Sequence, residues 1–143
     1  MNDTPAVTMS ASWDGGKRFV CRSATGHTVV TDAPTSVGGG DSGPTPMELL
    51  ILGLLGCTGI DVASILQRMR EPVEKLEVTA QVERAADHPR VYTRIRLTYI
   101  VTGDVAEAKL ARAIELSEGK FCSASAMLGR TADITSAYEI HPR

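Results

Sequence analysis

Apolar and polar residues alternate along the first part of the chain. The alternation runs over residues 7–13, resumes over 17–23 after a Gly-containing turn at 14–16, and returns over 27–32. Such period-two alternation predicts half-buried strands, and the intervening turn predicts a hairpin. The Gly-, Ser- and Pro-rich residues 36–46 that follow predict an irregular loop.

A long helix is predicted directly after this loop. Residues 45–48 (TPME) supply an N-capping Thr, a Pro at the first helical position and a Glu at the third, which is the pattern of a capping box. The helix is expected to reach about Arg70, because the residue before Pro72 avoids helical backbone. Its segment 49–60 is apolar on every face and shorter than the about 20 residues of a membrane span. We therefore expect a core helix that is covered on both sides.

The second half of the chain alternates again and then becomes helical. Residues 76–83 and 91–101 predict a long antiparallel pair of strands with one solvated face. Asp104 and Glu107 are expected to cap an amphipathic helix, whose apolar stripe comprises Ala106, Leu110, Ala113 and Ile114. A short helical segment, 122–128, and a final strand, 132–140, complete the order. We predict an α+β fold in a single domain, residues 1–143, and the all-apolar helix favours two copies packing together.

Composition narrows the possible functions. The chain has 143 residues, of which 43% are hydrophobic and 22% charged, so one domain can bury a core without disulfides or metals. Its 15 basic and 17 acidic residues give a net charge of −2, which argues against a general nucleic-acid binder. The N-terminus lacks the basic and apolar regions of a signal peptide, so we expect a cytoplasmic protein.

No metal or cofactor is expected. The three His residues lack ligand spacing. The glycines at 38–40 are not followed by the Lys and Ser or Thr of a phosphate-binding loop.

The cysteines are the candidate reactive groups. Cys57 lies in the apolar helix among small residues, where a cysteine usually serves as a small hydrophobe. Cys122 begins a helical turn after Lys120, and free N–H groups with a nearby cation favour a thiolate there. A structural role for Cys122 fits the sequence equally well. Cys21 shares the apolar face of its strand and is expected to fill the core, and spacing alone does not pair any two of the three.

Two cysteine-bearing blocks resemble the OsmC/Ohr family of stress-induced thiol peroxidases. They are GPTPMELLILGLLGCTGIDVASILQRM and FCSASAMLGRTADIT, and the likeness covers nearly the whole chain. The resemblance implies an OsmC-like fold, in which antiparallel sheets wrap around a central cysteine-bearing helix within an intertwined homodimer. Such a dimer would cover a helix that is apolar all round.

The resemblance also implies a mechanism. Cys57 would attack a small hydroperoxide as a thiolate, the resulting sulfenic acid would condense with Cys122, and a dithiol reductant, lipoyl-type in relatives, would restore the pair. Arg18 would hold the thiolate and Glu48 would position that Arg, with Arg22 on the same strand face as an alternative to Arg18. Organic hydroperoxides are expected to be preferred, because residues 50, 54 and 60 are apolar.

Glu48 and Asp61 are the two residues that bear on this mechanism most directly. Glu48 lies nine positions before Cys57, ~13 Å along a helix and out of phase with it, so it would act across the dimer. Asp61 lies four positions after Cys57 on the same face, where an unpaired carboxylate disfavours a thiolate. The pattern GCTGIDV resembles an uncharacterised OsmC-like branch. The alternative function is a non-catalytic OsmC-like protein that binds a small molecule or senses redox state.

Overall fold

The structure, a computed structural model, describes residues 4–143. The chain divides between Leu50 and Ile51 into two compact units. The prediction of one domain over residues 1–143 stays a prediction.

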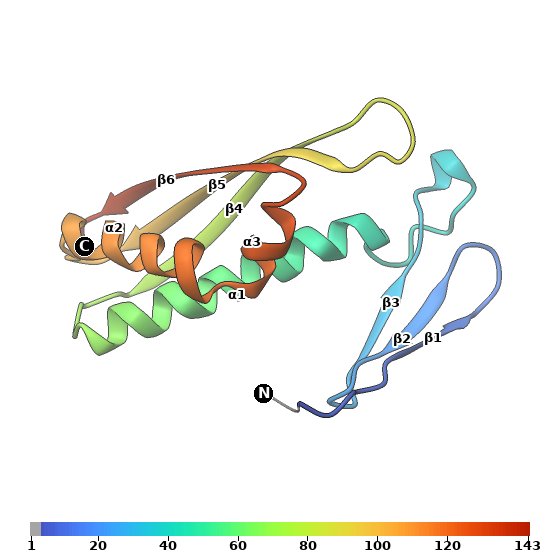
Figure 1. The fold of residues 1–143 in the computed structure, drawn as a ribbon, viewed down its shortest axis with the longest axis horizontal. Helices are drawn as coiled ribbons and strands as arrows, with labels where there is room; N and C mark the ends of the chain where they lie inside the picture. The colour runs from blue at the N-terminus through green and yellow to red at the C-terminus, as the bar shows by residue number, and fades with distance from the viewer. Residues whose placement is uncertain (1–3) are drawn as a thin grey trace. The chain divides into compact units, whose positions relative to one another are not determined.

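The first unit contains a three-stranded antiparallel sheet (Figure 1). Its strands are β1 (Ser10–Trp13), β2 (Phe19–Arg22) and β3 (Thr28–Thr31), in that spatial order, and a 3₁₀ turn, η1 (Thr35–Val37), follows. The expected hairpin is confirmed, because Trp13 pairs with Phe19 across a turn in which Gly15 and Gly16 have positive φ. Alternation therefore predicted these strands, each somewhat shorter than the alternating run.

Helix α1 (Pro46–Arg68) begins at the end of the first unit and continues into the second. The capping box is confirmed: the Thr45 N–H donates to Glu48 Oε1 over 2.8 Å, and the Glu48 N–H donates to Thr45 Oγ1 over 3.1 Å. The helix ends two residues before the expected Arg70, which adopts a positive φ of 59° and so turns the chain.

The second unit is built on a mixed sheet of three strands in the order β4-β5-β6. Strands β4 (Lys75–Arg84) and β5 (Tyr92–Thr102) form the expected antiparallel pair, with a bulge at Glu83 and Arg84. Strand β6 (Asp133–His141) joins parallel to β5 rather than antiparallel. The long connection through α2 (Glu107–Leu116), η2 (Ser117–Phe121) and α3 (Ser123–Leu128) makes this possible, since parallel strands need a crossover of a dozen or more residues.

The predicted cap of α2 is wrong. The N-cap is Ala106, which provides no side-chain cap, and its own N–H donates to Glu71 Oε1 over 2.7 Å. Glu71 thus holds the start of α2 from a distant part of the chain, a tertiary contact that the Asp104 to Glu107 spacing could not indicate. The apolar stripe is otherwise confirmed, because Leu110, Ala113 and Ile114 are buried.

Helices α1 and α2 cover one face of the β4-β5-β6 sheet (Figure 1). The core of this unit lies between them and consists of fully buried side chains from α1, β5 and α2: Leu54, Val62, Leu66, Ile95, Leu97, Tyr99, Val101 and Leu110. Alternate residues of β5 such as Arg94 and Arg96 point to the other face and are exposed. This is the arrangement of a sheet with one solvated side.

Helix α1 is less covered than the sequence led us to expect. Leu50, Leu52 and Ile60 are 49%, 52% and 69% exposed, and a side chain at Gly53 or Gly56 would meet nothing within 4 Å. By length and composition alone α1 could cross a membrane, a property that it shares with core helices of soluble proteins. A single chain therefore covers one side of α1 and leaves an apolar side open.

Candidate functional site

The second unit brings the thiols of Cys57 and Cys122 together. Cys57 projects from α1 and is half-buried, whereas Cys122 is the N-cap of α3 and only 2% exposed. Burial raises the pKa of Cys122, hydrogen bonds from Ser125 lower it, and a hydrogen bond with Cys57 and the charge on Cys57 raise it again. One thiol is therefore open to solvent and its neighbour is enclosed.

The prediction that the surroundings of Cys122 favour its thiolate is wrong, because they raise its pKa. The Ser125 N–H does donate to Cys122 Sγ over 3.4 Å, as a helix start allows. The pKa of Cys122 is nevertheless raised, because burial outweighs that contact. The ammonium of Lys120 lies 5.1 Å from the centre of the Phe121 ring, so the structure pairs this cation with an aromatic ring.

A chain of polar side chains lies near the cysteine pair. Ser117 Oγ donates to Asp61 Oδ2 over 2.9 Å and lies 2.8 Å from Thr58 Oγ1. Thr58 Oγ1 in turn lies 2.8 Å from the Tyr99 hydroxyl, which donates to Glu118 Oε2 over 2.6 Å. We call these five residues the hydroxyl chain.

The interior of the hydroxyl chain is closed to solvent and its ends are open. Thr58, Tyr99 and Ser117 are 0% exposed. Asp61 lines a hollow of 320 Å³ with Arg68 and Phe121, and Glu118 lines hollows of 530 and 290 Å³ that Asp61 does not reach. Three buried hydroxyls thus connect two carboxylates that face separate openings.

Tyr99 shows how strongly this environment affects protonation. Its pKa is raised, first by burial and then by its hydrogen bond to the Glu118 carboxylate, and a charge on Cys122 raises it further. The hydroxyl of Tyr99 therefore stays protonated and lies within electrostatic range of the buried cysteine.

Ser117 and Glu118 owe their positions to a local irregularity. Residues Ser117–Phe121 form a π-helix between α2 and α3, a rare conformation that is frequent at functional sites. The wider turn presents both the Ser117 hydroxyl and the Glu118 carboxylate to groups on α1 and β5.

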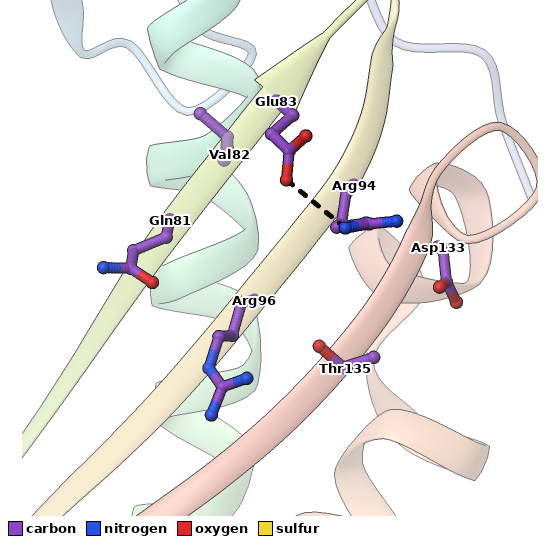
Figure 2. A pocket seen from close by; sticks show the side chains of 7 residues that line it. All are labelled: Gln81, Val82, Glu83, Arg94, Arg96, Asp133 and Thr135. Carbon is purple, nitrogen blue, oxygen red and sulfur yellow. Dashed lines mark ion pairs between the residues drawn. The ribbon is translucent and has the colours of Figure 1, made fainter.

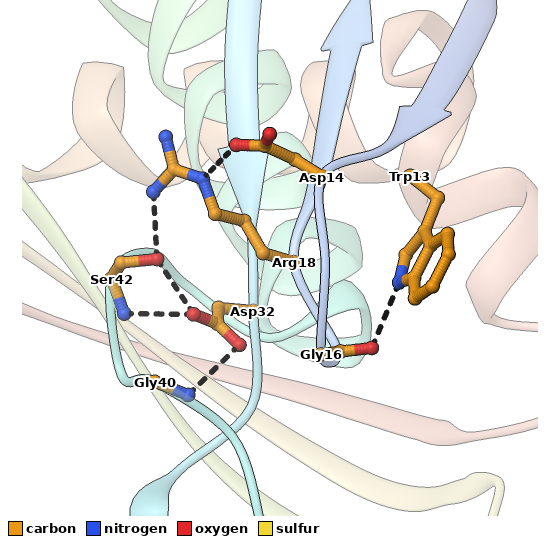
Figure 3. Close-up of polar contacts among 7 residues, drawn as sticks. All are labelled: Trp13, Asp14, Gly16, Arg18, Asp32, Gly40 and Ser42. Carbon is orange, nitrogen blue, oxygen red and sulfur yellow. Dashed lines mark hydrogen bonds and ion pairs between the residues drawn. The ribbon is translucent and has the colours of Figure 1, made fainter.

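Arg18 lies in the first unit and has two partners there (Figure 3). Its Nε donates to Asp14 Oδ2 over 2.8 Å and its Nη1 donates to Ser42 Oγ over 2.9 Å. Ser42 Oγ in turn donates to Asp32 Oδ2 over 2.6 Å. Arg18 is thus tied to the loop that precedes α1, and its role beside Cys57 stays a prediction.

Glu48 and Arg22 also belong to the first unit. The Glu48 carboxylate accepts the Thr45 N–H, which accounts for this residue structurally. Arg22 is exposed and forms no ion pair among residues 4–143. The functional roles that the sequence resemblance implied for both residues likewise stay predictions.

The apolar residues named for the substrate pocket and Asp61 differ in their surroundings. Leu54 is fully buried, whereas Leu50 and Ile60 are exposed, and the apolar pocket around these three residues stays a prediction. Asp61 forms no ion pair within residues 4–143, and its carboxylate accepts a hydrogen bond from the Ser117 hydroxyl.

The solvated face of the β4-β5-β6 sheet carries a separate hollow of 420 Å³ (Figure 2). Apart from Val82 it is lined by charged and polar side chains, among them Arg96 and the pair Arg94 and Glu83, in which Arg94 Nη1 lies 3.6 Å from Glu83 Oε2. Neither cysteine lines it, and it contains no nucleophile that is set beside a base. Among the described residues no cluster of three His, Cys, Asp or Glu side chains could hold a metal.

No sequence pattern predicted a role at the site for Thr58, Tyr99, Ser117 or Glu118. A signal for two of them is present in the pattern: Thr58 interrupts an apolar helix, and Tyr99 occupies an inward position of a strand whose other inward residues are aliphatic. Polar groups at buried positions need partners. The π-helix that supplies those partners has no recognisable sequence signal.

Comparison with known proteins gives consistent results. The sequence model of a family described as OsmC-like protein matches residues 38–137. Protein YhfA of Escherichia coli K12 is 42% identical over 129 residues, 90% of this chain and 93% of that protein. A hypothetical protein of Aquifex aeolicus has a solved structure that is 26% identical, with a TM-score of 0.86 over 98% of this chain and 99% of that one.

An organic hydroperoxide resistance protein OsmC of Legionella pneumophila has the same fold. It is 15% identical, with a TM-score of 0.73 over 96% of this chain and 99% of that one. The match to the family model, the identity to a relative and the shared fold agree, and the chain therefore belongs to the OsmC-like protein family.

Proposed function

We propose that the protein is a cytoplasmic thiol peroxidase that reduces organic hydroperoxides through Cys57 and Cys122. The observation that carries the proposal is the adjacency of the two thiols, one open to solvent and one enclosed. One protein of the same fold is named for organic hydroperoxide resistance and another for induction by osmotic stress and a detoxification response, which supports a role in stress defence.

The difference in burial assigns the roles of the two cysteines. The half-buried Cys57 is reachable by a substrate, and its thiolate would attack the distal oxygen of the hydroperoxide, forming an S–O bond and breaking the O–O bond. The alcohol leaves and Cys57 becomes a sulfenic acid. Cys122, enclosed and protonated by its raised pKa, would then displace water from that sulfur to form the disulfide, and a dithiol reductant would restore both thiols.

Arg18 is proposed to stabilise the Cys57 thiolate with its positive charge. Glu48 is proposed to position Arg18 with its negative charge. A thiol of ordinary pKa is only a few per cent ionised near neutral pH, so a cation would speed attack. The test must separate this role of Glu48 from its capping role. Glu48→Gln keeps a capping-box side chain, so it should leave unfolding unchanged while slowing the oxidation of Cys57.

The peroxidase proposal is tested by mixing reduced protein with an alkyl hydroperoxide in a stopped-flow instrument and by mass analysis. Wild type and the matched control Cys21→Ser should react at equal rates and form a Cys57–Cys122 disulfide. Cys122→Ser should accumulate a sulfenic acid, which a dimedone-type reagent traps. A Cys57→Ser protein that consumed the hydroperoxide at the wild-type rate would refute the proposal.

A second function is favoured by one observation, the Asp61 carboxylate on the face of Cys57 without a cationic partner in residues 4–143. A nearby carboxylate disfavours a thiolate, which suits a slow, reversible disulfide in a redox sensor better than fast turnover. Disulfide formation without repeated consumption of hydroperoxide in the presence of excess dithiol would favour the sensor over the enzyme.

The proposed partners are a second copy of the chain, a small hydroperoxide and a dithiol reductant. The open apolar side of α1, with exposed Leu50, Leu52 and Ile60, supports the homodimer, because an uncovered patch of this kind is unusual on a monomer. Neither a nucleic acid nor a membrane is proposed as a partner.

A further inference from the structure

Ser117 is linked by hydrogen bonds to the backbone segments that carry both cysteines. Its hydroxyl lies 2.8 Å from Thr58 Oγ1, and Thr58 follows Cys57 directly in α1. Its carbonyl oxygen accepts the N–H of Cys122 over 2.7 Å. Two hydrogen bonds therefore join the residue after Cys57 to Cys122 through a single residue. We call Thr58, Ser117 and the Cys122 N–H the cysteine bridge.

The π-helix η2 accounts for this arrangement. The bond from the Cys122 N–H to the Ser117 carbonyl oxygen joins a residue to the fifth one after it, whereas the bonds of an α-helix reach only the fourth. The extra residue in the turn places Cys122, rather than Phe121, at the end of the bond. Such insertions are frequent at functional sites. The irregular turn therefore selects Cys122 as the partner of Ser117.

Cys122 is also held on its other side. The Ser125 N–H donates to Cys122 Sγ over 3.4 Å, and the Ser125 hydroxyl donates to the Cys122 carbonyl oxygen over 3.1 Å. The bridge is enclosed, because Thr58 and Ser117 are 0% exposed and Cys122 is 2% exposed. In a buried place, solvent does not replace a hydrogen bond that is lost. The position of Cys122 relative to α1 therefore depends on the hydroxyls of Thr58 and Ser117.

We propose that Ser117, together with Thr58, is a positioning residue that sets Cys122 against Cys57 and thereby favours the disulfide between them. This inference rests on the peroxidase function proposed above and adds to it the residues that govern its second step. Both residues act through the position of the Cys122 backbone and not on the reacting sulfur atoms.

The step that the bridge assists is the condensation of the Cys57 sulfenic acid with Cys122. The Cys122 sulfur attacks the Cys57 sulfur, the S–S bond forms, the S–O bond breaks, and the oxygen leaves as water with the thiol proton of Cys122. Its rate depends on how closely the two sulfurs are held, and a displacement of about 1 Å can slow such a step about a hundredfold. The earlier attack of Cys57 on the hydroperoxide does not involve Cys122. A broken bridge should therefore slow the second step and leave the first unchanged.

Two substitutions break the cysteine bridge from opposite sides. Thr58→Val replaces the hydroxyl of Thr58 with a methyl group, and Ser117→Ala removes the hydroxyl of Ser117 while its carbonyl oxygen remains. Thr58→Ser keeps a hydroxyl at the same place and is the rescue variant. Val101→Ala shortens an apolar side chain that is 0% exposed, so it lowers stability without touching the bridge. Circular dichroism shows which variants are folded, and either bridge variant alone suffices for the test.

Rapid-quench mass analysis with tert-butyl hydroperoxide in excess separates the two steps. A dimedone-type reagent traps the sulfenic acid, and the loss of two hydrogens marks the disulfide. We expect Thr58→Val and Ser117→Ala to form the sulfenic acid at the wild-type rate and to convert it to the disulfide about tenfold more slowly. Thr58→Ser and Val101→Ala should convert it within about threefold of the wild-type rate. Wild-type conversion in the bridge variants, or an equal loss in Val101→Ala, would overturn the inference while the peroxidase function stands.

Equilibration with reduced and oxidised dithiothreitol tests the positioning without a peroxide. The exchange passes two electrons and two protons between dithiothreitol and the Cys57–Cys122 pair, and its equilibrium constant measures how well the protein holds the two sulfurs together. Thr58→Val and Ser117→Ala should need about a tenfold higher ratio of oxidised to reduced dithiothreitol for half-oxidation, which is a potential about 30 mV higher. Thr58→Ser and Val101→Ala should match wild type.

The two measurements distinguish failure of the inference from failure of the proposed function. A wild-type protein that does not react with hydroperoxides would refute the proposed function, and the dithiothreitol equilibrium would still decide whether the bridge positions Cys122. Equal half-oxidation ratios for wild type and the bridge variants would overturn the inference. A wild-type protein that forms no Cys57–Cys122 disulfide at any ratio would overturn it as well.

Discussion

At the scale of single residues, Asp32 organises the loop that precedes α1. The side chain is 3% exposed and accepts hydrogen bonds from the N–H groups of Ala33, Gly40 and Ser42 and from the Ser42 hydroxyl. These hydrogen bonds lower the pKa of Asp32 from 3.8 to about 2, and the bond from the Ser42 hydroxyl has the largest effect. The same Ser42 also holds Arg18 (Figure 3), so the protonation of Asp32 bears on the position of that cation.

A pH dependence of stability follows from this shift. Because the folded pKa lies below the unfolded value, ionised Asp32 stabilises the protein above about pH 4, and this contribution is lost as the pH falls towards about 2. In urea unfolding over this range, the midpoint of wild type should fall further than that of Asp32→Asn. Asp41→Asn, an exposed neighbour in the same loop, should follow wild type, and parallel curves for wild type and Asp32→Asn would contradict the prediction.

A second residue-scale prediction concerns the core of the second unit. Leu66 is 0% exposed and Met127 is 75% exposed. Leu66→Ala should lower the free energy of unfolding by about 2–5 kcal/mol, through lost burial and the cavity left behind. Met127→Ala should change it by less than about 0.5 kcal/mol. Denaturant unfolding measures both, and a Leu66→Ala cost no greater than that of Met127→Ala would show that this core is not formed.

At the scale of elements, the capping pattern in the sequence correctly predicted the start of helix α1 but not the cap of α2. Both were predicted from a capping pattern, but the reciprocal bonds of Thr45 and Glu48 are local, whereas the start of α2 is held by Glu71 from outside the helix. Sequence patterns thus predict interactions between near neighbours and miss those that folding creates.

Thr45 gives the element-scale test of the capping box. Thr45→Ala removes the oxygen that accepts the Glu48 N–H and should cost about 1 kcal/mol of stability. Thr45→Ser retains that oxygen and should cost only a few tenths of a kcal/mol. Thermal unfolding measures the loss of stability in both variants. Equal losses of stability would mean that the Thr methyl group contributes through packing and that the hydroxyl does not contribute through capping.

The junction between β5 and α2 depends on Gly103. Its φ is +131°, and a Cβ there would lie 2.2 Å from the carbonyl oxygen of Pro72. Gly26 has a φ of +89° with nothing within 4 Å of a Cβ, so Gly26→Ala isolates the cost of backbone strain, about 1–2 kcal/mol. Gly103→Ala should cost clearly more in denaturant unfolding, and equal costs would mean that the Pro72 backbone moves aside freely.

At the scale of the whole molecule, the open side of α1 gives the test of the proposed dimer. Leu52→Glu puts a charge on an apolar side chain that is 52% exposed and should shift the protein from dimer to monomer in sedimentation. Ala86→Glu, in the exposed turn between β4 and β5, should leave the association unchanged. A wild-type protein that sediments as a monomer would refute the dimer.

The site shows the limit of sequence reasoning at this scale. The cysteine blocks indicated the family and both thiols, but Cys57 and Cys122 lie on separate elements, and only the crossover through η2 sets them side by side. The buried partners of Thr58 come from β5 and η2, two elements remote in sequence. Periodicity identifies which face of an element is buried and carries no information about which groups meet there.

The parallel pairing of β6 has a consequence for the order of folding. The β4–β5 hairpin joins strands that are neighbours in sequence. Arg94 pairs with Asp133 only after the crossover connection that carries Cys122 has packed against the sheet. Contacts between distant residues form late, because closing the larger loop costs more entropy. We therefore expect the hairpin to form early and Cys122 to reach Cys57 only when β6 docks, so that a newly made chain acquires its reactive pair as one of its last events.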